Sequence, residues 1–149
     1  MSDPHCITLE EVLALADVWF RGVASDESPI TLSRLFSDSE ARIHAPDGTA
    51  FSLEYHRLLH RRWTDESHQM GDFKLTTLCA NPWRVQALGT VYWQARYRGN
   101  PASDCSVIKA VVGEEWVIER RADGTLCFVL YLTRFFHLLP GSAPIRLDS

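Results

Sequence analysis

Residues 106–138, SVIKAVVGEEWVIERRADGTLCFVLYLTRFFHL, decide the fold, because they hold two long apolar runs on either side of Ala122-Asp123-Gly124-Thr125. An Asp-Gly pair between two such runs is a strong β-hairpin signal. The reason is that a type I′ turn needs positive φ at both central residues, which Asp and Gly tolerate. The stretch therefore predicts a long antiparallel hairpin with Asp123 and Gly124 as its two loop residues.

A two-residue loop also fixes the register of the hairpin, because each residue of one strand then has one partner on the other. Side chains alternate between the two faces of a strand, so one face is expected to carry every second pair. This first face comprises Ile118 with Val129, Trp116 with Tyr131, Glu114 with Thr133, Val112 with Phe135, and Ala110 with His137. A three-residue loop with a bulge would exchange the two faces.

Both faces of the predicted hairpin are largely apolar. The run 126–132, LCFVLYL, lacks the polar residue at every second position that a strand with one solvated face shows. The preceding chain offers only about two good helices, enough to cover one face. We therefore expect the second face to be buried against another subunit, in a homodimer formed through the outer face of the sheet.

The first half of the chain is mainly helical. Thr8-Leu9-Glu10-Glu11 is a capping box, and apolar residues at helical spacing continue from it to Val23. A short helix is expected to end at Phe36, starting at Pro29 or Thr31. A short strand is expected over 41–45, and Pro46-Asp47-Gly48 after it is expected to make a turn.

A second long helix is expected after this turn, capped by Thr49 or Ser52. Its inner stripe comprises Phe51, Tyr55, Leu58, Leu59 and Arg62 or Trp63. From Asp72 onward the apolar period changes to two and predicts strands over 73–79 and 85–97. This order of elements, helices first and then a meander of four longer strands, is typical of an α+β fold.

The bulk properties indicate one globular domain over 1–149, with a core over about 7–138 and a loosely held tail over 139–149. Of the 149 residues, 46% are hydrophobic, and the net charge of −4 disfavours nucleic acid as a partner. No apolar run approaches the roughly 20 residues of a membrane span, and the N-terminus lacks a signal-peptide pattern. We therefore expect a cytoplasmic protein with no membrane partner. The four cysteines show no C-x-x-C spacing and require no bridges.

At this level the chain resembles the nuclear transport factor 2-like superfamily, which includes SnoaL-like polyketide cyclases, ketosteroid isomerases and scytalone dehydratase. The resemblance covers residues 7–138 and rests on element order, on His44-Ala45-Pro46-Asp47-Gly48 and on Arg120-Arg121-Ala122-Asp123-Gly124. It implies a cystatin-like α+β cone, in which a curved, mixed but mostly antiparallel sheet wraps around about three N-terminal helices. A pocket between helices and sheet, and dimerisation through the outer face, are further implications.

Two departures from this family bear on mechanism. In ketosteroid isomerases the catalytic Asp directly precedes the Pro of the first-strand turn, and Ala45 stands at the matching position. Those enzymes also project a Tyr from the first helix, where this chain has Trp19 and Phe20, which we expect in the core. Steroid isomerisation by that route is therefore not expected.

The first face of the hairpin supplies the candidate catalytic groups. If it lines the pocket, Glu114 and His137 share an apolar wall that raises the pKa of the carboxyl and lowers that of the imidazole, so they could act as acid and base. Tyr131 would orient a substrate oxygen, with Thr133 as a further binding residue. The alternative is that Glu114 and His137 are solvated near the strand ends, with Tyr131 and Trp116 in the core.

Further candidates lie elsewhere in the chain. His44 and Asp47 flank Pro46 at the expected mouth, although Asp47-Gly48 can equally be a simple turn. The aromatic residues expected to line the pocket are Tyr55, Trp63, Trp93 and Trp116.

His56 and His60 have the i, i+4 spacing of a metal pair. No third ligand is evident, so an exposed helix face or the cavity rim are the other interpretations. We expect no metal and no organic cofactor.

The sequence therefore predicts a domain that binds a small apolar molecule. It could act as a cofactor-independent cyclase, dehydratase or isomerase using general acid-base catalysis. The rival hypothesis is a non-catalytic ligand-binding or dimerisation module of the same fold, because one fold hosts many functions.

Overall fold

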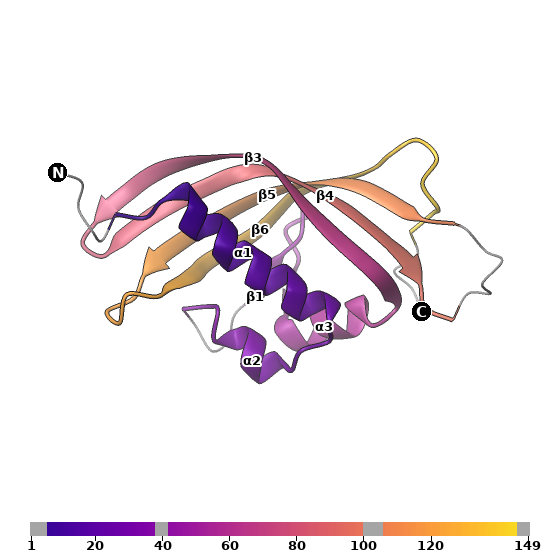
Figure 1. Ribbon diagram of the computed structural model, residues 1–149, viewed down its shortest axis with the longest axis horizontal. Helices are drawn as coiled ribbons and strands as arrows, with labels where there is room; N and C mark the ends of the chain where they lie inside the picture. Colours follow the sequence, from indigo (N-terminus) through magenta and orange to yellow (C-terminus); the bar gives the residue numbers. More distant parts are fainter. Residues whose placement is uncertain (1–5, 38–41, 100–105, 146–149) are drawn as a thin grey trace.

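The computed structural model describes residues 6–37, 42–99 and 106–145, and it has the predicted α+β architecture. The helices are α1 (Leu9–Ala24), α2 (Pro29–Ser33) and α3 (Leu53–His60). The strands are β1 (Arg42–His44), β2 (Ala50–Ser52), β3 (Trp63–Ala80), β4 (Trp83–Tyr97), β5 (Ile108–Arg120) and β6 (Leu126–Leu138). These strands form a sheet in the order β2-β1-β6-β5-β4-β3, in which only β1 and β6 are parallel. The sheet curves over the helices, which lie together on its concave side (Figure 1).

The helices begin where the sequence indicates. The hydroxyl of Thr8 accepts from the Glu11 amide, and the Glu11 carboxylate accepts in turn from the Thr8 amide, so the capping box is confirmed. Ser52 caps α3 by accepting from the Tyr55 amide. The short helix α2 ends at Ser33 rather than Phe36.

The elements after β1 differ from the prediction in two ways. Residues 50–52, which include Phe51 of the predicted helix stripe, form β2 and pair with β1. The strand predicted over 73–79 begins ten residues earlier, so Trp63 starts β3 instead of ending α3. The reason is that residues 64–72 are mostly polar on both faces of the strand, including Glu66 and His68 on the side that faces the helices, so no apolar period shows before Phe73. Ala41, the predicted start of the first strand, lies outside the described residues.

The turn of the β5–β6 hairpin has three loop residues, 122–124, instead of two. The Arg121 amide donates to the Thr125 carbonyl over 2.7 Å, and Gly124 has a φ of 91°. The middle of the hairpin nevertheless has the predicted register, because Glu114 pairs with Thr133 and Trp116 with Tyr131.

Two register shifts in β6 explain this outcome. The first lies at Val129, so that Ile118 pairs with Phe128 and the one-residue offset of the turn is cancelled. The second lies at Arg134 and produces a new offset beyond it. A shift of one residue moves every following side chain to the opposite face. The register predicted for the two ends of the hairpin was therefore wrong.

His137 is the residue that this second shift displaces. It pairs with Val111 instead of Ala110, and it is exposed. Phe136 pairs with Val112 in its place and faces the concave side, whereas Phe135 packs over Gly113 on the outer face. The expectation that His137 shares a wall with Glu114 was therefore wrong.

Two hydrophobic clusters lie on the concave side of the sheet. The larger packs α1 against the middle of the sheet and includes Trp19, Trp116 and Phe128. The smaller surrounds Trp63 and Trp93 at the other end. Residues 139–145, which we expected to be loosely held, run back beside β5 and hydrogen-bond to it and to its approach.

Candidate functional site

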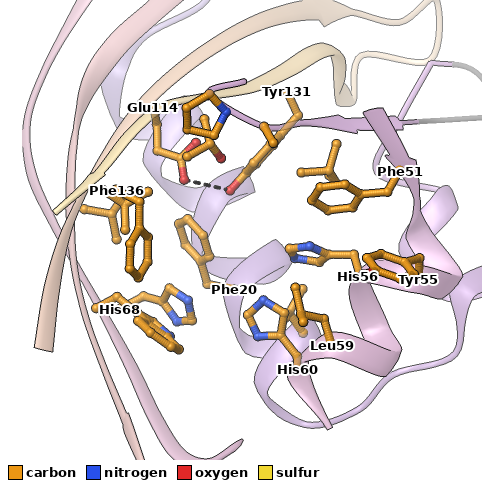
Figure 2. A pocket seen from close by; sticks show the side chains of 18 of the residues that line it. Phe20, Phe51, Tyr55, His56, Leu59, His60, His68, Glu114, Tyr131 and Phe136 are labelled. Atoms are coloured by element: carbon orange, nitrogen blue, oxygen red, sulfur yellow. Dashed lines mark hydrogen bonds between the residues drawn. The ribbon is translucent and has the colours of Figure 1, made fainter. Parts of the chain in front are cut away.

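A cavity of about 520 Å³ opens between the helices and the concave face of the sheet (Figure 2). Its walls come from α1, α3, the β1–β2 turn, the four long strands and Ile145. The mouth lies at the β1–β2 turn, where the lining residues Pro46, Asp47, Thr49 and Tyr55 are exposed. The volume suits a small organic molecule.

The lining is mainly apolar and aromatic. Prominent members are Phe20, Phe51, Leu59, Trp63, Trp93 and Phe136. Within the described ranges, no Lys or Arg side chain lines the cavity. The inner polar groups are His56, His60, His68, Glu114, Tyr131 and Thr133.

Glu114 is the most deeply placed acidic group of the cavity, with 3% of its surface exposed. The Tyr131 hydroxyl donates to its Oε1 over 3.2 Å, as Figure 2 shows. Its Oε2 has no hydrogen-bond partner among the described residues. Burial raises the pKa of Glu114 to about 8, although Tyr131, Trp116 and Thr133 act in the opposite direction. The carboxyl is therefore protonated at neutral pH.

Tyr131 is held rigidly in the same wall. Its ring packs against Trp19 and Trp116 at centroid distances of 5.5 Å and 5.8 Å. Burial, and next the charge of Glu114, raise the pKa of Tyr131 well above its ordinary value. The hydroxyl therefore keeps its proton and remains a donor to Glu114.

On the opposite side of the cavity, α3 and β3 bring a buried histidine and glutamate together. His60 Nδ1 lies 2.7 Å from Glu66 Oε1, and the Trp93 indole N–H donates to the same oxygen over 3.1 Å. Glu66 has 2% of its side chain exposed. Burial lowers the pKa of His60 to about 3 and raises the pKa of Glu66.

The other two imidazoles of the cavity are packed on aromatic rings. His68 stacks on Phe20 with centroids 4.2 Å apart, and His56 stacks on Trp19 at 5.5 Å. Burial lowers the pKa of His68 to about 4 and lowers the pKa of His56 as well. These rings keep some accessible surface because they face the cavity, but protein surrounds them, so both are neutral at pH 7.

Most of the predicted site residues meet at this cavity. Those that line it are Glu114, Tyr131, Thr133, Tyr55, Trp63, Trp93 and Asp47. Three lie elsewhere. Trp116 is fully buried in the core behind the wall, and His137 is on the outer face. His44 alternates with Ile43, which faces the cavity, so His44 points away from it.

Several residues of the site were not predicted. His56 and His60 line the cavity, which was one of three interpretations of their spacing. Glu66 and His68 were missed because they lie in the polar part of β3. The signal that could have found them is their i, i+2 spacing, which places both side chains on one face of a strand.

Solved structures of similar shape identify the fold. A hexachlorocyclohexane dehydrochlorinase LinA-type3 from Novosphingobium barchaimii superimposes with a TM-score of 0.63 and 19% identity over 92% of this chain and 93% of its own. An NTF2-like protein from Cytophaga hutchinsonii gives 0.59 and 8% over 85% and 98%. A ketosteroid isomerase-like protein from Erwinia carotovora atroseptica gives 0.60 and 11% over 84% and 93%. The chain has the nuclear transport factor 2-like fold.

Beyond the NTF2-like fold, sequence comparison adds nothing, because no family model and no curated protein matches the chain. Sequence identities of 8–19% to the similar structures support a shared fold but do not indicate a shared activity. Among the described residues of this NTF2-like domain, no helix is long and apolar enough to cross a membrane.

Proposed function

We propose that this domain binds an uncharged, largely apolar small molecule and transforms it by general acid-base catalysis, as a cyclase, dehydratase or isomerase. The carrying observation is the carboxyl of Glu114, which is buried in the wall of an apolar cavity and has one oxygen without a partner. A buried polar atom without a partner is unusual in proteins, and a ligand that hydrogen-bonds to it removes the cost.

The two oxygens of Glu114 have different roles in this proposal. Because the Tyr131 hydroxyl donates to Oε1, that oxygen acts as the acceptor of the protonated carboxyl. The proton then resides on Oε2, which has no acceptor among the described residues. Glu114 is thus placed to donate to a carbonyl or hydroxyl oxygen of the ligand, as a general acid does.

The composition of the wall supports an uncharged ligand. With Glu114 protonated and the three histidines neutral, the inner cavity has no charged lining group, and no lining Lys or Arg would pair with an anion. Burying an unpaired charge in such a site costs several kcal/mol or more. Some polarity in the ligand is favoured, because His56 Nδ1 and Trp63 Nε1 are also buried without partners among the described residues.

Two of the similar structures bear enzyme names that agree with chemistry of this kind, a dehydrochlorinase and a ketosteroid isomerase-like protein. Acid-base catalysis without a cofactor would need only the side chains described above.

The proposed oligomer is a homodimer through the outer face of the sheet. Half-buried apolar side chains on this face come from three adjacent strands: Leu88, Tyr92, Val111, Val117, Leu130 and Leu132. The helices cover the other face, so a second copy is the proposed cover for this one.

Native mass spectrometry of protein purified from its own host tests both the proposed ligand and the proposed dimer. We expect a dimer mass and a stoichiometric uncharged organic compound that is released on denaturation. A clean monomer would contradict the dimer, and a tightly bound anion would contradict the uncharged ligand.

The released compound and its close analogues then serve as trial substrates. Glu114→Gln should retain binding within a few-fold but lose turnover, because the amide fills the same space without an acidic proton. Glu115→Gln is the matched control, since the neighbouring side chain points to the outer face. Binding without turnover in the wild type would instead favour the non-catalytic module.

A further inference from the structure

His60 stands between two cavities. It lines the apolar cavity, and it also lines a second cavity of about 350 Å³, whose polar walls are Asp26, Arg61 and Arg98. Val23 is the other residue common to both linings. His60 therefore separates an apolar chamber, where a ligand fits, from a polar chamber with charged groups.

A carboxylate holds the His60 ring, which sets it apart from the other two imidazoles of the cavity. Among the described residues, it alone of the three has a carboxylate within hydrogen-bond distance, Glu66 at 2.7 Å. The Trp93 indole N–H fixes the same Glu66 oxygen, so the carboxylate cannot turn away freely. With Nδ1 occupied by Glu66, Nε2 is the ring nitrogen left for a ligand.

We propose that His60 is the general base of this cavity, that Glu66 and Trp93 are positioning residues for it, and that the polar chamber beyond His60 returns protons to solvent. The inference rests on the proposed function, because it supplies the base that complements the acid Glu114. His60 takes the role of base that the sequence had suggested for His137, which the register shift of β6 removes from the cavity.

The proton balance of the step is simple. His60 Nε2 takes a proton from a carbon of the ligand, and the electron pair of that C–H bond stays on the ligand, where it forms a new double bond. Glu114 gives its proton to the ligand oxygen that receives the displaced electron pair. His60 is left protonated beside the Glu66 carboxylate, and Glu114 is left ionised. Proton exchange with solvent restores both groups.

The groups around His60 define its expected pH behaviour. Those that face it are Glu66 and His68 from β3, His56 and Arg61 at α3, Asp26 after α1, and Arg98 after β4. Burial dominates over these neighbours and keeps the ring neutral well below pH 6.5. His60 should therefore remain a competent nucleophile in mildly acidic solution, where an ordinary imidazole is protonated.

Acylation by diethyl pyrocarbonate, an uncharged reagent that reacts with the neutral but not the protonated imidazole, tests this without a substrate. Mass spectrometry of the digested protein measures the rate at His60, with exposed His137 as the accessible site and N-acetylhistidine as the free reference. Between pH 8 and pH 5 the free reference should slow by roughly 30-fold. The rate at His60 should change less than about twofold.

Glu66→Gln tests the positioning role. The amide preserves shape but removes the charge that stabilises the developing imidazolium, so acylation of His60 should slow by roughly tenfold, the factor equivalent to one pKa unit. Glu54→Gln, an exposed change in the first turn of α3, is the matched control and should have no effect. Glu66→Asp, which keeps the charge, should give a rate of His60 acylation between those of Glu66→Gln and the wild type.

Three results would overturn the proposal: no acylation of His60 while His137 reacts, a His60 rate that falls with the free reference, or an unchanged rate in Glu66→Gln. Nitrogen-15 NMR of the wild-type imidazoles decides the matter if the variants fail to fold. It should find the proton of His60 on Nδ1, and a proton on Nε2 would refute the assignment. These readouts need no ligand, so they fail independently of the proposed function.

Discussion

At the scale of single residues, the site depends most on whether the Glu114 carboxyl is ionised or protonated. Tyr131, Trp116 and Thr133 each favour the ionised form, whereas burial favours the protonated form and is the largest influence. Burial prevails because the wall around the carboxyl is aromatic and the described residues offer no cation to it. The result is a proton held at neutral pH at the inner surface of the cavity.

Tyr131→Phe should raise the pKa of Glu114 further, by about one unit, because the lost hydroxyl stabilises the ionised form. The change should also destabilise the fold by about 1–3 kcal/mol, since it leaves Oε1 without its donor. Carbon-13 NMR titration of the glutamate carboxyl carbons measures the shift, with Glu114→Gln to assign the signal. Tyr92→Phe, on the outer face of β4, is the control, and a Glu114 signal that moves to lower pH in Tyr131→Phe would refute this account.

At the scale of elements, the two register shifts of β6 determine which side chains form the cavity wall. The shift at Arg134 brings Phe136 to the concave side and places Phe135 over Gly113 on the outer face. A Cβ at residue 113 would overlap the Phe135 ring. The absence of a side chain there therefore lets the strand accommodate the bulge.

Gly113→Ala should cost about 1–3 kcal/mol of unfolding free energy, because the Phe135 ring must move. In a Phe135→Ala background the same substitution should cost almost nothing. A double-mutant cycle by chemical denaturation measures the coupling. Equal costs in both backgrounds would show that the bulge does not depend on this contact.

The same elements show what the sequence could and could not predict. The Asp-Gly turn, the capping box of α1 and the period of the long strands are local signals, and they led to the correct fold. Glu114 lies opposite Thr133 as predicted, but only because the shift at Val129 cancels the offset of the three-residue loop. The bulges depend on packing between strands, as at Phe135 and Gly113, so the position of His137 could not be read from spacing. Glu66 was missed because it and His68 are polar at the inward positions of β3, where an apolar residue would have marked the strand.

At the scale of the whole molecule, the curved sheet separates two environments. Its concave side holds the aromatic core and the cavity, with Glu114 and Tyr131 on one wall and His56 and His60 on the other (Figure 2). Its outer face is half-buried and apolar in part, as the proposed dimer requires. The chemistry of the cavity therefore depends on how the entire sheet is bent around the helices.

The pH dependence of global stability follows from the buried carboxyl. Glu114 has a pKa of about 8 in the folded protein against 4.5 as an ordinary glutamate, so between these values the folded state binds a proton that the unfolded state releases. Stability from this group is therefore complete below pH 4.5 and is lost as pH rises through 8. His60 and His68 have lowered pKa values and contribute changes only below about pH 6.5.

The measurement that tests the central claim most directly is the unfolding free energy of the wild type and Glu114→Gln by urea denaturation at pH 6.5 and pH 8. We predict that the wild type loses roughly 1.5 kcal/mol more than the variant over this interval. The difference between the two proteins removes the contributions of Glu66 and of every other group that titrates in both. Parallel pH profiles, with no extra loss in the wild type, would show that Glu114 is already ionised at neutral pH and would contradict the proposed acid.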